Sequence, residues 1–328
     1  MNLRSYLIGL ITLLMIAVRP LDANALFLPG DANGDDELNI TDVTMLINYL
    51  LNESSETVVA TADVNGDGVV NITDVTTLTS IVINGETDAQ TETFTIDGVS
   101  FTMVRVTGGT FMMGNNSYFW CHPSHEVTLS DFSIGQIEVT QELWLAVMGV
   151  NPSWFCSADG YEDDLMRPVE EVNWYHCRDF ILKLNRLTGR TFRLPTEAEW
   201  EFAARGGNKS KGYLYAGSDD LSKVGWFEQN IPSQEEGTEG YGTQRVGLKR
   251  PNELGLYDMS GNVCEWCQDW YSDFSSEPQV NPAGPATGDR RVIRGGAWHH
   301  DAFNNEIHNR MGIHPGYSYA DLGLRLAL

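Results

Sequence analysis

Apolar residues near the N-terminus recur at helical spacing in two short segments that are separated by polar stretches. The first segment covers 43–50 and the second covers 75–82, and each presents apolar side chains at i, i+3 and i+7. This spacing places the apolar residues on one face, so each segment predicts one short amphipathic helix. The two faces consist of Val43, Leu46, Ile47 and Leu50, and of Val75, Leu78 and Val82.

The pattern changes from residue 94 onward, where short alternating segments predict strands. These segments are 101–104, 110–114, 127–129 and 132–134. Helices are expected to begin near Thr140 and at Asn173, because apolar residues then recur at helical spacing. Thr196 and Glu199 have the spacing of a capping box, which predicts a third helix start. Long loops rich in Gly and Trp join these elements, so we expect an α+β domain with much irregular loop.

The first 25 residues have the pattern of an export signal. Arg4 precedes an apolar run over 6–18, and residues 23–25 have the small-x-small form of a cleavage site. The run is short for a membrane span, although an uncleaved anchor helix is the alternative. We therefore interpret 1–25 as a signal peptide. The mature chain is then expected to be secreted or at the cell surface after bacterial-type export, with no membrane span.

The charge of the chain is strongly acidic, with 45 Asp and Glu against 21 Lys and Arg and a formal net charge of −24. Such a field argues against nucleic acids and anionic membranes as partners. Between Arg19 and Arg105 there is no Lys or Arg, whereas this stretch contains fifteen Asp or Glu. The acid excess is therefore partly local, and it favours a cation as the partner of this region.

A twelve-residue repeat explains where many of these acids lie. Segment 31–42 is followed 32 residues later by segment 63–74, and both carry oxygen side chains at loop positions 1, 3, 5, 9 and 12. Position 7 offers a backbone carbonyl, and Ca²⁺ takes six to eight such oxygen ligands. The predicted ligands are Asp31, Asn33, Asp35, Glu37, Asn39 and Asp42 in the first loop, and Asp63, Asn65, Asp67, Val69, Asn71 and Asp74 in the second. Two bound ions would supply much of the folding energy of so small a core. The alternative is a solvated acidic repeat without metal.

The repeat resembles a type I dockerin over residues 30 to about 85, since the second copy matches the motif DxNxDGxxNxxD throughout. The resemblance implies a small all-α domain that holds two Ca²⁺ and binds a cohesin-like protein. It also implies that loop positions 10 and 11 select the partner, and these are Ile40, Thr41, Ile72 and Thr73. We assign 26–86 to this domain and the polar segment 87–95 to a linker.

The five cysteines do not form a recognisable site. An exported chain can form disulfides, but the odd number leaves at least one thiol unpaired, and the pairing stays open. Cys264 and Cys267 have CxxC spacing, yet no second CxxC or His pair completes a zinc set. Buried thiols are the favoured interpretation. The cysteines are Cys121, Cys156, Cys177, Cys264 and Cys267.

The second domain, assigned to 96–328, resembles the formylglycine-generating-enzyme or sulfatase-modifying-factor family. The matching segments, in the order of that family, are 107–114, 138–140, 168–174, 193–201, 252–266, 294–298 and 323–325. The resemblance implies a C-type-lectin-like α+β fold. It also implies one further Ca²⁺, held by the side chains of Asp258 and Glu265 and the carbonyls of Gly261 and Val263. The alternative is that Glu265 only closes its loop by hydrogen bonds.

The same resemblance places the two copper-binding cysteines of that family at His300 and Asn305. Because a thiolate pair is what holds Cu(I), we expect no copper and favour a domain without catalytic activity. No other catalytic residues are assigned. His299 and His300 are expected to point to opposite faces of a strand, which argues against a metal chelate by this pair.

The tail over 299–321 is rich in His, Asn, Asp, Tyr and Ser. It resembles the variable region of lectin-fold proteins that retroelements diversify, and a drifted enzyme tail is the alternative. In the first interpretation Trp298, Arg310 and Pro315 form the scaffold, and the rest forms a surface for a protein or glycan ligand. The candidate ligand surface contains His299, His300, Asp301, Phe303, Asn304, Asn305, His308, Tyr317 and Tyr319.

Four functions are therefore weighed. The first is an exported calcium-binding protein whose lectin-fold domain binds a ligand and whose dockerin binds a cohesin-like partner. The second is a sulfatase-modifying oxidase. The third is an accessory component of an extracellular polysaccharide-degrading complex, which rests on the dockerin alone. The fourth is a retroelement-diversified binding protein.

Overall fold

The computed structural model describes the chain in two compact units, Met1–Ala89 and Gln90–Leu328. The described residues are 30–32, 39–52, 62–64, 70–84, 91–157, 160–161 and 164–328. The interpretation of 1–25 as a signal peptide lies outside them, as do six predicted calcium ligands and residues 87–90 of the predicted linker. The six ligands are Asn33, Asp35, Glu37, Asn65, Asp67 and Val69. None of the helices in the described segments has the length and apolar character needed to span a bilayer.

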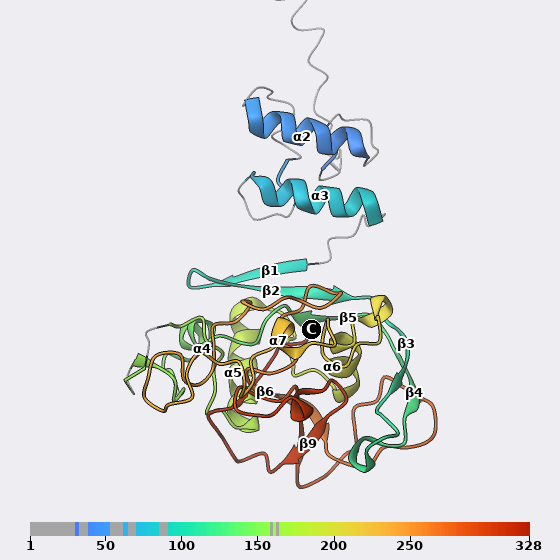
Figure 1. Cartoon of the computed structure of the whole chain (residues 1–328), viewed down its shortest axis with the longest axis vertical. Helices are drawn as coiled ribbons and strands as arrows, with labels where there is room; N and C mark the ends of the chain where they lie inside the picture. Colours follow the sequence, from blue (N-terminus) through green and yellow to red (C-terminus); the bar gives the residue numbers. More distant parts are fainter. Residues whose placement is uncertain are drawn as a thin grey trace, which may run out of the picture. The chain divides into compact units, whose positions relative to one another are not determined.

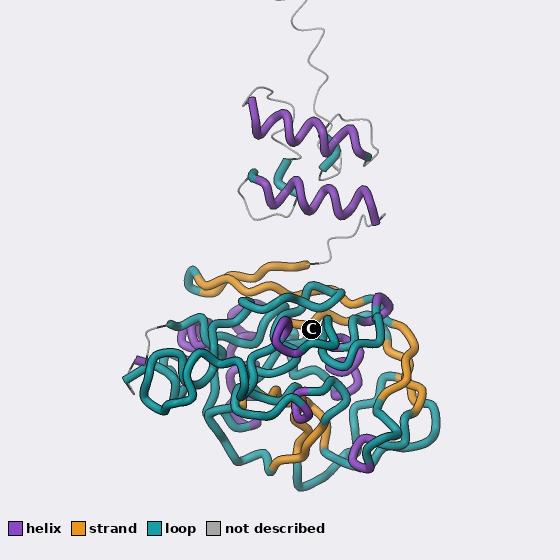
Figure 2. The backbone as a smooth tube through the Cα atoms, viewed as in Figure 1, coloured by secondary structure: helices purple, strands orange, loops and turns teal. Residues whose placement is uncertain are grey.

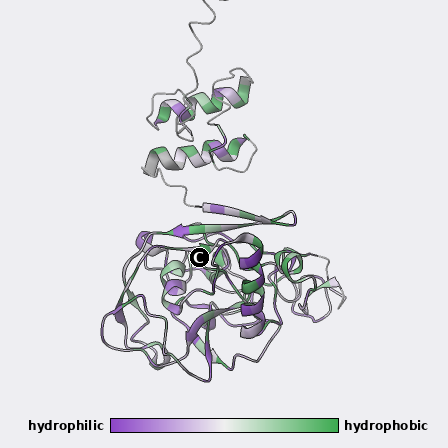
Figure 3. Ribbon diagram, turned by 180° about the vertical axis from the view of Figure 1, so that it is seen from behind, coloured by the Kyte–Doolittle hydropathy of each residue, from purple (hydrophilic) through white to green (hydrophobic). Residues whose placement is uncertain are grey.

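In the first unit, helices α2 (Ile40–Asn52) and α3 (Ile72–Asn84) pack against each other (Figure 1). Hydrophobic and hydrophilic residues alternate along both helices (Figure 3). Their contact buries Val43 and Leu46 with Val75 and Leu78. Ile47 was predicted to belong to this core, but it is 38% exposed and lies outside it. It follows Leu46 directly and is therefore turned by roughly 100° about the helix axis. The prediction that this unit is an all-α domain stays a prediction, because residues 33–38, 53–61 and 65–69 lie outside the described residues.

The second unit begins with a three-stranded antiparallel sheet of β1 (Thr91–Ile96), β2 (Val99–Val106) and β5 (Phe132–Gly135). Residues 91–95 were assigned to the linker, and this boundary is wrong. Thr91 pairs with Val104, and the pairing continues along the whole strand. Threonine-rich segments suit such a half-exposed edge strand, whose polarity resembles that of a linker.

In the described part of this unit, two further sheets and four α-helices follow, and loops make up much of it (Figure 2). One sheet has the order β3-β4-β7 and the other the order β10-β6-β8-β9. β1 and β2 lie at one end of the unit and β9 at the opposite end (Figure 1). The remaining elements are β3 (Gly109–Met113), β4 (His125–Leu129), β6 (Cys264–Trp270), β7 (Gln279–Val280), β8 (Arg291–Arg294), β9 (Arg310–Ile313), β10 (Leu322–Gly323), α4 (Gln141–Met148), α5 (Trp174–Thr188), α6 (Glu197–Ala204) and α7 (Leu221–Val224). The prediction of mixed helix and strand with long loops is confirmed for this unit.

The predicted helix starts are confirmed by their caps. Thr140 Oγ1 accepts a hydrogen bond from the backbone N–H of Leu143 at the start of α4. The Asn173 side chain caps α5 in the same way. Thr196 and Glu199 form both bonds of the capping box of α6. Each cap satisfies backbone N–H groups that have no partner inside the helix.

All five cysteines are buried, as the interpretation of buried thiols required. Cys264 and Cys267 lie on β6, three residues apart, so their side chains point to opposite faces of the sheet. Cys264 packs in the cluster that contains Trp266, and Cys267 packs in the cluster that contains Trp200. The CxxC spacing therefore creates no paired site.

Candidate functional site

The two predicted calcium loops close in the same way. Both carboxylate oxygens of Asp42 accept backbone N–H groups of its own loop, from Ala32 and Asn39, each at 2.9 Å. Asp74 repeats this arrangement at 2.8 Å with the second and ninth residues of the second loop. Both carboxylates are fully buried. Buried acids that close oxygen-rich loops in two copies fit a hard cation such as Ca²⁺.

The residues predicted to select the partner lie on the first turn of each helix and are exposed. Ile40 is 64% exposed and Ile72 is 66% exposed, and Thr41 and Thr73 beside them also face solvent. Large apolar side chains at equivalent places in two copies form two similar surfaces. Such exposed pairs fit a docking role, because nothing in the fold of the described residues requires them to be apolar.

The predicted calcium site of the second unit is buried, and one of its acids is paired with an arginine. Nε of Arg325 lies 3.0 Å from both oxygens of Glu265, and Nη2 lies 2.7 Å from Oε1. Nε1 of Trp200 donates to Oε2 at 2.7 Å. The guanidinium thus supplies the positive charge at Glu265. The four predicted ligands are Asp258, Gly261, Val263 and Glu265, and all are buried.

Asp258 keeps one oxygen without a partner. Its Oδ2 accepts the N–H of Gly247 at 2.7 Å, whereas its buried Oδ1 has no hydrogen bond. Burial raises the pKa of Asp258 to about 6. Burial, followed by the charges of Asp258 and Glu265, also raises the pKa of Glu138, which accepts a hydrogen bond from Asn262. Three acids, Asp258, Glu265 and Glu138, thus lie near one arginine, and Oδ1 of Asp258 is available as a donor. A Ca²⁺ at Asp258 therefore stays a prediction.

Part of the candidate ligand surface lines a cavity of about 630 Å³. His299, His300 and Tyr319 border it together with Tyr241 and Trp298. Trp298 is buried, and its indole N–H donates to the carbonyl of Ala320 at 3.2 Å. This bond joins the two ends of the tail. Tyr317 lies next to this group, with its ring 6.1 Å from that of Tyr319.

The prediction that His299 and His300 point to opposite faces of a strand is wrong. β8 ends at Arg294, and Gly295 and Gly296 follow with φ values of 97° and 74°. These left-handed glycines turn the chain, so the two histidines lie in a turn, with ring centroids 4.6 Å apart. Nε2 of His299 and Nε2 of His300 lie 3.7 and 3.6 Å from Oδ2 of Asp321.

Asn305, the second position predicted to match the family's cysteine pair, helps to build the turn. It is fully buried, and its Nδ2 donates to the carbonyl of Asp301 at 2.6 Å and to that of His300 at 3.4 Å. The two positions that the resemblance assigns to thiols carry an imidazole and an amide in this chain. These residues do not fit the Cu(I) site of that family, because neither offers a thiolate.

The other candidate ligand residues form a separate aromatic cluster. The rings of Phe303 and His308 lie 5.1 and 5.3 Å from the ring of Tyr118, and Phe303 also contacts Trp120. Burial lowers the pKa of His308 to about 4. The predicted surface is therefore divided into the group at the cavity and this cluster. Asn304 lies beside the cluster and bonds to Asp301 at 2.9 Å.

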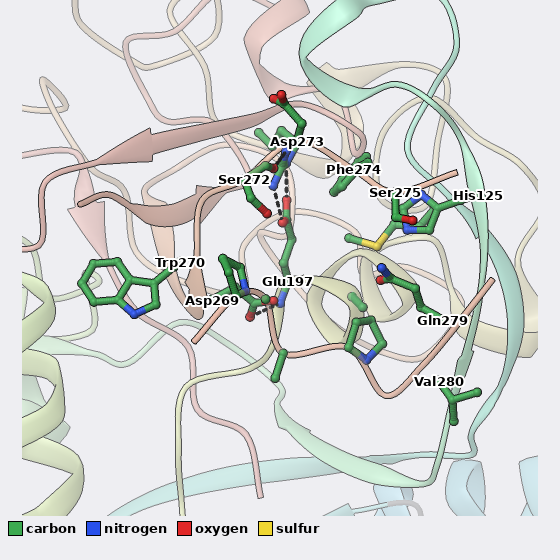
Figure 4. A pocket seen from close by; sticks show the side chains of 17 residues that line it. His125, Glu197, Asp269, Trp270, Ser272, Asp273, Phe274, Ser275, Gln279 and Val280 are labelled. Carbon is green, nitrogen blue, oxygen red and sulfur yellow. Dashed lines mark hydrogen bonds and ion pairs between the residues drawn. The ribbon is translucent and has the colours of Figure 1, made fainter. Parts of the chain in front are cut away.

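A second cavity, of about 490 Å³, was not predicted (Figure 4). It is lined by Glu197, which forms two bonds of 2.6 Å with Arg310, and by Asp269, which accepts the backbone N–H of Glu197 at 2.9 Å. Burial, followed by the charge of Glu197, raises the pKa of Asp269 to about 7. The sequence gives one indication of Glu197, because this residue begins the capped helix α6. It gives no indication that Asp269 belongs to the same site, because Asp269 lies 72 residues further along the chain.

Comparison with known families places both units. Residues 91–328 match the sulfatase-modifying factor enzyme 1-like domain. The chain belongs to this family. Residues 29–82 match the type I dockerin domain. Dockerins of this type bind calcium, which supports the two Ca²⁺ predicted for the loops.

Two curated relatives are similar to the sulfatase-modifying-factor domain. The formylglycine-generating enzyme of Streptomyces coelicolor is 37% identical over 199 residues, which cover 56% of this chain and 60% of that enzyme. A chaperone protein, LppX, of Paenibacillus barcinonensis is 36% identical over 244 residues, which cover 61% of this chain and 79% of that protein. The match thus spans less than two thirds of the Streptomyces enzyme.

Two solved structures share the fold of the sulfatase-modifying-factor domain. Treponema denticola variable protein 1 has a TM-score of 0.64 and 36% identity, with 72% of this chain and 98% of that chain covered. PvdO from Pseudomonas aeruginosa has a TM-score of 0.58 and 24% identity, with 72% and 97% covered. The likeness to PvdO concerns the fold alone.

Proposed function

We propose that this protein is exported and binds a protein or glycan ligand without modifying it, while its dockerin attaches it to a cohesin-like partner. The proposal is supported by the residues His300 and Asn305, which stand at the two positions that the resemblance assigns to the family's cysteines. His300 borders the open cavity, and Asn305 is buried in the turn below it. In this proposal the thiols of the family's oxidation chemistry are replaced by a half-buried histidine at the cavity and a buried asparagine that holds the turn.

The walls of the cavity suit recognition. Trp298, Tyr241 and Tyr319 offer flat aromatic area, and His299 and Asp321 offer hydrogen-bonding groups. Aromatic residues with polar tips supply contact area at a low entropy cost and dominate many binding surfaces. Tyr319 is 45% exposed, so a ligand has access to it. A C-type-lectin-like description of this domain is part of the same proposal.

The catalytic alternative is tested by incubating the full chain with a sulfatase-derived cysteine peptide, copper and oxygen. The Streptomyces coelicolor enzyme serves as a positive control, and mass spectrometry reads the product. We expect the cysteine peptide to be unchanged with this protein. Aldehyde formation above the peptide-only background would overturn the proposal.

Binding is tested on glycan and protein arrays with the full chain and two tyrosine variants. Tyr319→Ala removes an aromatic wall of the cavity, whereas Tyr175→Ala removes an exposed tyrosine on α5 that does not line it. We expect the Tyr319→Ala variant to lose binding to any ligand that the wild type binds, and the Tyr175→Ala variant to retain it. Equal binding by both variants would place the ligand elsewhere.

A diversified tail is the second candidate, favoured by the likeness to a protein that is itself named a variable protein. The tail is fixed at three places that do not depend on its exposed residues. These are the Trp298–Ala320 bond, the Arg310–Glu197 pair and the bond from the N–H of Trp174 to the carbonyl of Pro315. A search of the neighbouring genes for an adenine-substituted copy of this region and a reverse transcriptase decides the question. Neighbouring cohesin or glycoside-hydrolase genes would instead support a role in a polysaccharide-degrading complex.

A further inference from the structure

We propose that His299, His300 and Asp321 bind a divalent transition metal of the Zn²⁺ class, with the buried Cys264 of strand β6 as a fourth donor. This site is distinct from the calcium loops, and it does not depend on whether the cavity binds a protein or glycan. It also differs from the cysteine pair of the family, because imidazoles and a carboxylate supply three of its donors.

Cys264, His300 and Asp321 lie close enough together to share one ion, and His299 lies beside the carboxylate of Asp321. Oδ2 of Asp321 lies 3.7 Å from Nε2 of His299 and 3.6 Å from Nε2 of His300. Donor atoms of Cys264, His300 and Asp321 lie within 4.8 Å of one another. Tetrahedral zinc, with bonds of 2.0–2.3 Å, separates its ligand atoms by roughly 3.3–3.8 Å. Within the described segments, no other three such side chains converge as closely.

The backbone holds these donors in place from both sides. The N–H of Cys264 donates to the carbonyl of Asp321 at 2.7 Å, and β6 pairs with β10 directly after this bond. The N–H of His300 donates to the carbonyl of Ala297 at 3.0 Å, and the carbonyl of His300 accepts the N–H of Glu228 at 3.1 Å. Donors on fixed backbone lose little entropy when an ion binds, which favours affinity.

One atom in the cluster lacks the partner that a buried polar group needs. Nδ1 of His300 is buried and makes no hydrogen bond. Burial of this atom is therefore not compensated by a hydrogen bond from the protein. An ion coordinated by Nδ1 would supply the missing partner, whereas an ion coordinated by Nε2, which faces Asp321, would leave Nδ1 unchanged.

The donor set selects the class of metal. Imidazole and thiol donors favour zinc and related transition metals over Ca²⁺ and Mg²⁺, which prefer oxygen. Cys264 is fully buried, so its thiol is better placed to hold an ion than to attack a substrate. His299 faces solvent and borders the cavity, which provides a path for the ion to enter.

The site is tested with the full chain, with calcium in excess so that the acidic loops are filled. Zinc is added by equilibrium dialysis and measured by mass spectrometry of the metal. We expect one zinc per chain in wild type, and at least about tenfold weaker binding in His300→Ala, His299→Ala and Asp321→Asn. His314→Ala is the control, because His314 lies in the same tail and is exposed, outside the cluster.

Cobalt provides the test of the thiol. Tetrahedral Co²⁺ gives intense visible bands, and a thiolate ligand adds a charge-transfer band in the near ultraviolet. We expect Cys264→Ser to lose this band, with near-ultraviolet circular dichroism confirming that the variant is folded. Retention of the band would remove Cys264 from the site. Equal zinc uptake by wild type and Asp321→Asn, or loss of zinc in His314→Ala, would overturn the whole proposal, while the binding function proposed above would stand.

Discussion

Arg325 and Glu265 form a buried ion pair that connects the end of the chain to strand β6. The guanidinium also donates to the carbonyls of Gly135 at 2.9 Å and Tyr257 at 2.8 Å, so its donors are shared among three segments. A buried carboxylate that loses its only adjacent cation costs several kcal/mol. We therefore expect Arg325 to contribute strongly to the stability of the second unit.

We expect Arg325→Met to lower the free energy of unfolding by about 3–5 kcal/mol, because Glu265 would stay buried and charged without its partner. Urea denaturation followed by tryptophan fluorescence measures the change. Arg105→Met is the matched control, since Arg105 and Asp131 form an exposed pair at 3.3 Å. The control should cost less than about 1 kcal/mol. Similar losses in the two variants would contradict the role given to burial.

Calcium binding at Asp258 gives a second prediction. A protein with Asp42→Ala and Asp74→Ala carries disabled loops, so any remaining calcium effect comes from the second unit. We expect Ca²⁺ to raise the melting temperature of this protein, because an ion that binds only the folded state stabilises it. Adding Asp258→Asn should abolish the rise. If Ca²⁺ does not change the melting temperature before Asp258 is substituted, no calcium ion binds there, and the prediction is wrong.

The calcium loops give a third prediction. We expect a chelator to reduce the helical circular dichroism signal that comes from residues 30–85, because the small core of α2 and α3 depends on closed loops. Asp63→Ala should weaken calcium binding at the second loop, whereas the first loop keeps its affinity. A helical signal that does not respond to chelator would refute the metal dependence.

Docking gives a fourth prediction, built on the two exposed isoleucines. The single variants Ile40→Asp and Ile72→Asp should each still bind a cohesin-like partner, because the other copy of the repeat offers the same surface. The double variant should lose binding by more than about tenfold, since a charge replaces the apolar contact on both copies. Surface plasmon resonance against a panel of cohesins measures this. Complete loss in one single variant would show that only one orientation is used.

Asp269 gives a fifth prediction, which concerns pH. Its pKa is about 7 in the folded protein, above the ordinary value of 3.8 for an aspartate. The neutral form is thus stabilised by folding, fully so below about pH 4, and this contribution is lost as the pH rises through 7. Between pH 5 and pH 8, wild type should lose on the order of 2 kcal/mol more stability than Asp269→Asn. Urea titrations of both proteins at the two pH values test this, and parallel losses would contradict it.

The sequence was most informative where function and structure depend on neighbouring residues. The capping box of Thr196 and Glu199 and the repeated acidic loops follow from local spacing alone. The cavity could not be predicted from local spacing, because Asp321 lies near His300 only through the pairing of β10 with β6. The pairing of Glu265 with Arg325 joins residues 60 positions apart, and nothing in either local sequence indicates it.

The error at His299 and His300 has a physical cause that the sequence did contain. Two consecutive glycines precede them, and residues of that type can enter the left-handed conformations that end a strand. Gly296 is also confined by Asn305, whose side chain occupies the space that a Cβ would need. The left-handed conformation of both glycines therefore sets the direction of the two histidine side chains that follow.

The bond from Trp298 to Ala320 makes the intervening segment a closed loop on a fixed base. Inside it, Arg310 and Pro315 are anchored to other elements, whereas Met311, Tyr317 and Tyr319 remain exposed. Mutations at the exposed positions therefore alter the chemistry of the surface with little effect on the fold. This division gives natural selection, or a designer, a segment in which new recognition properties can arise at a low risk of misfolding.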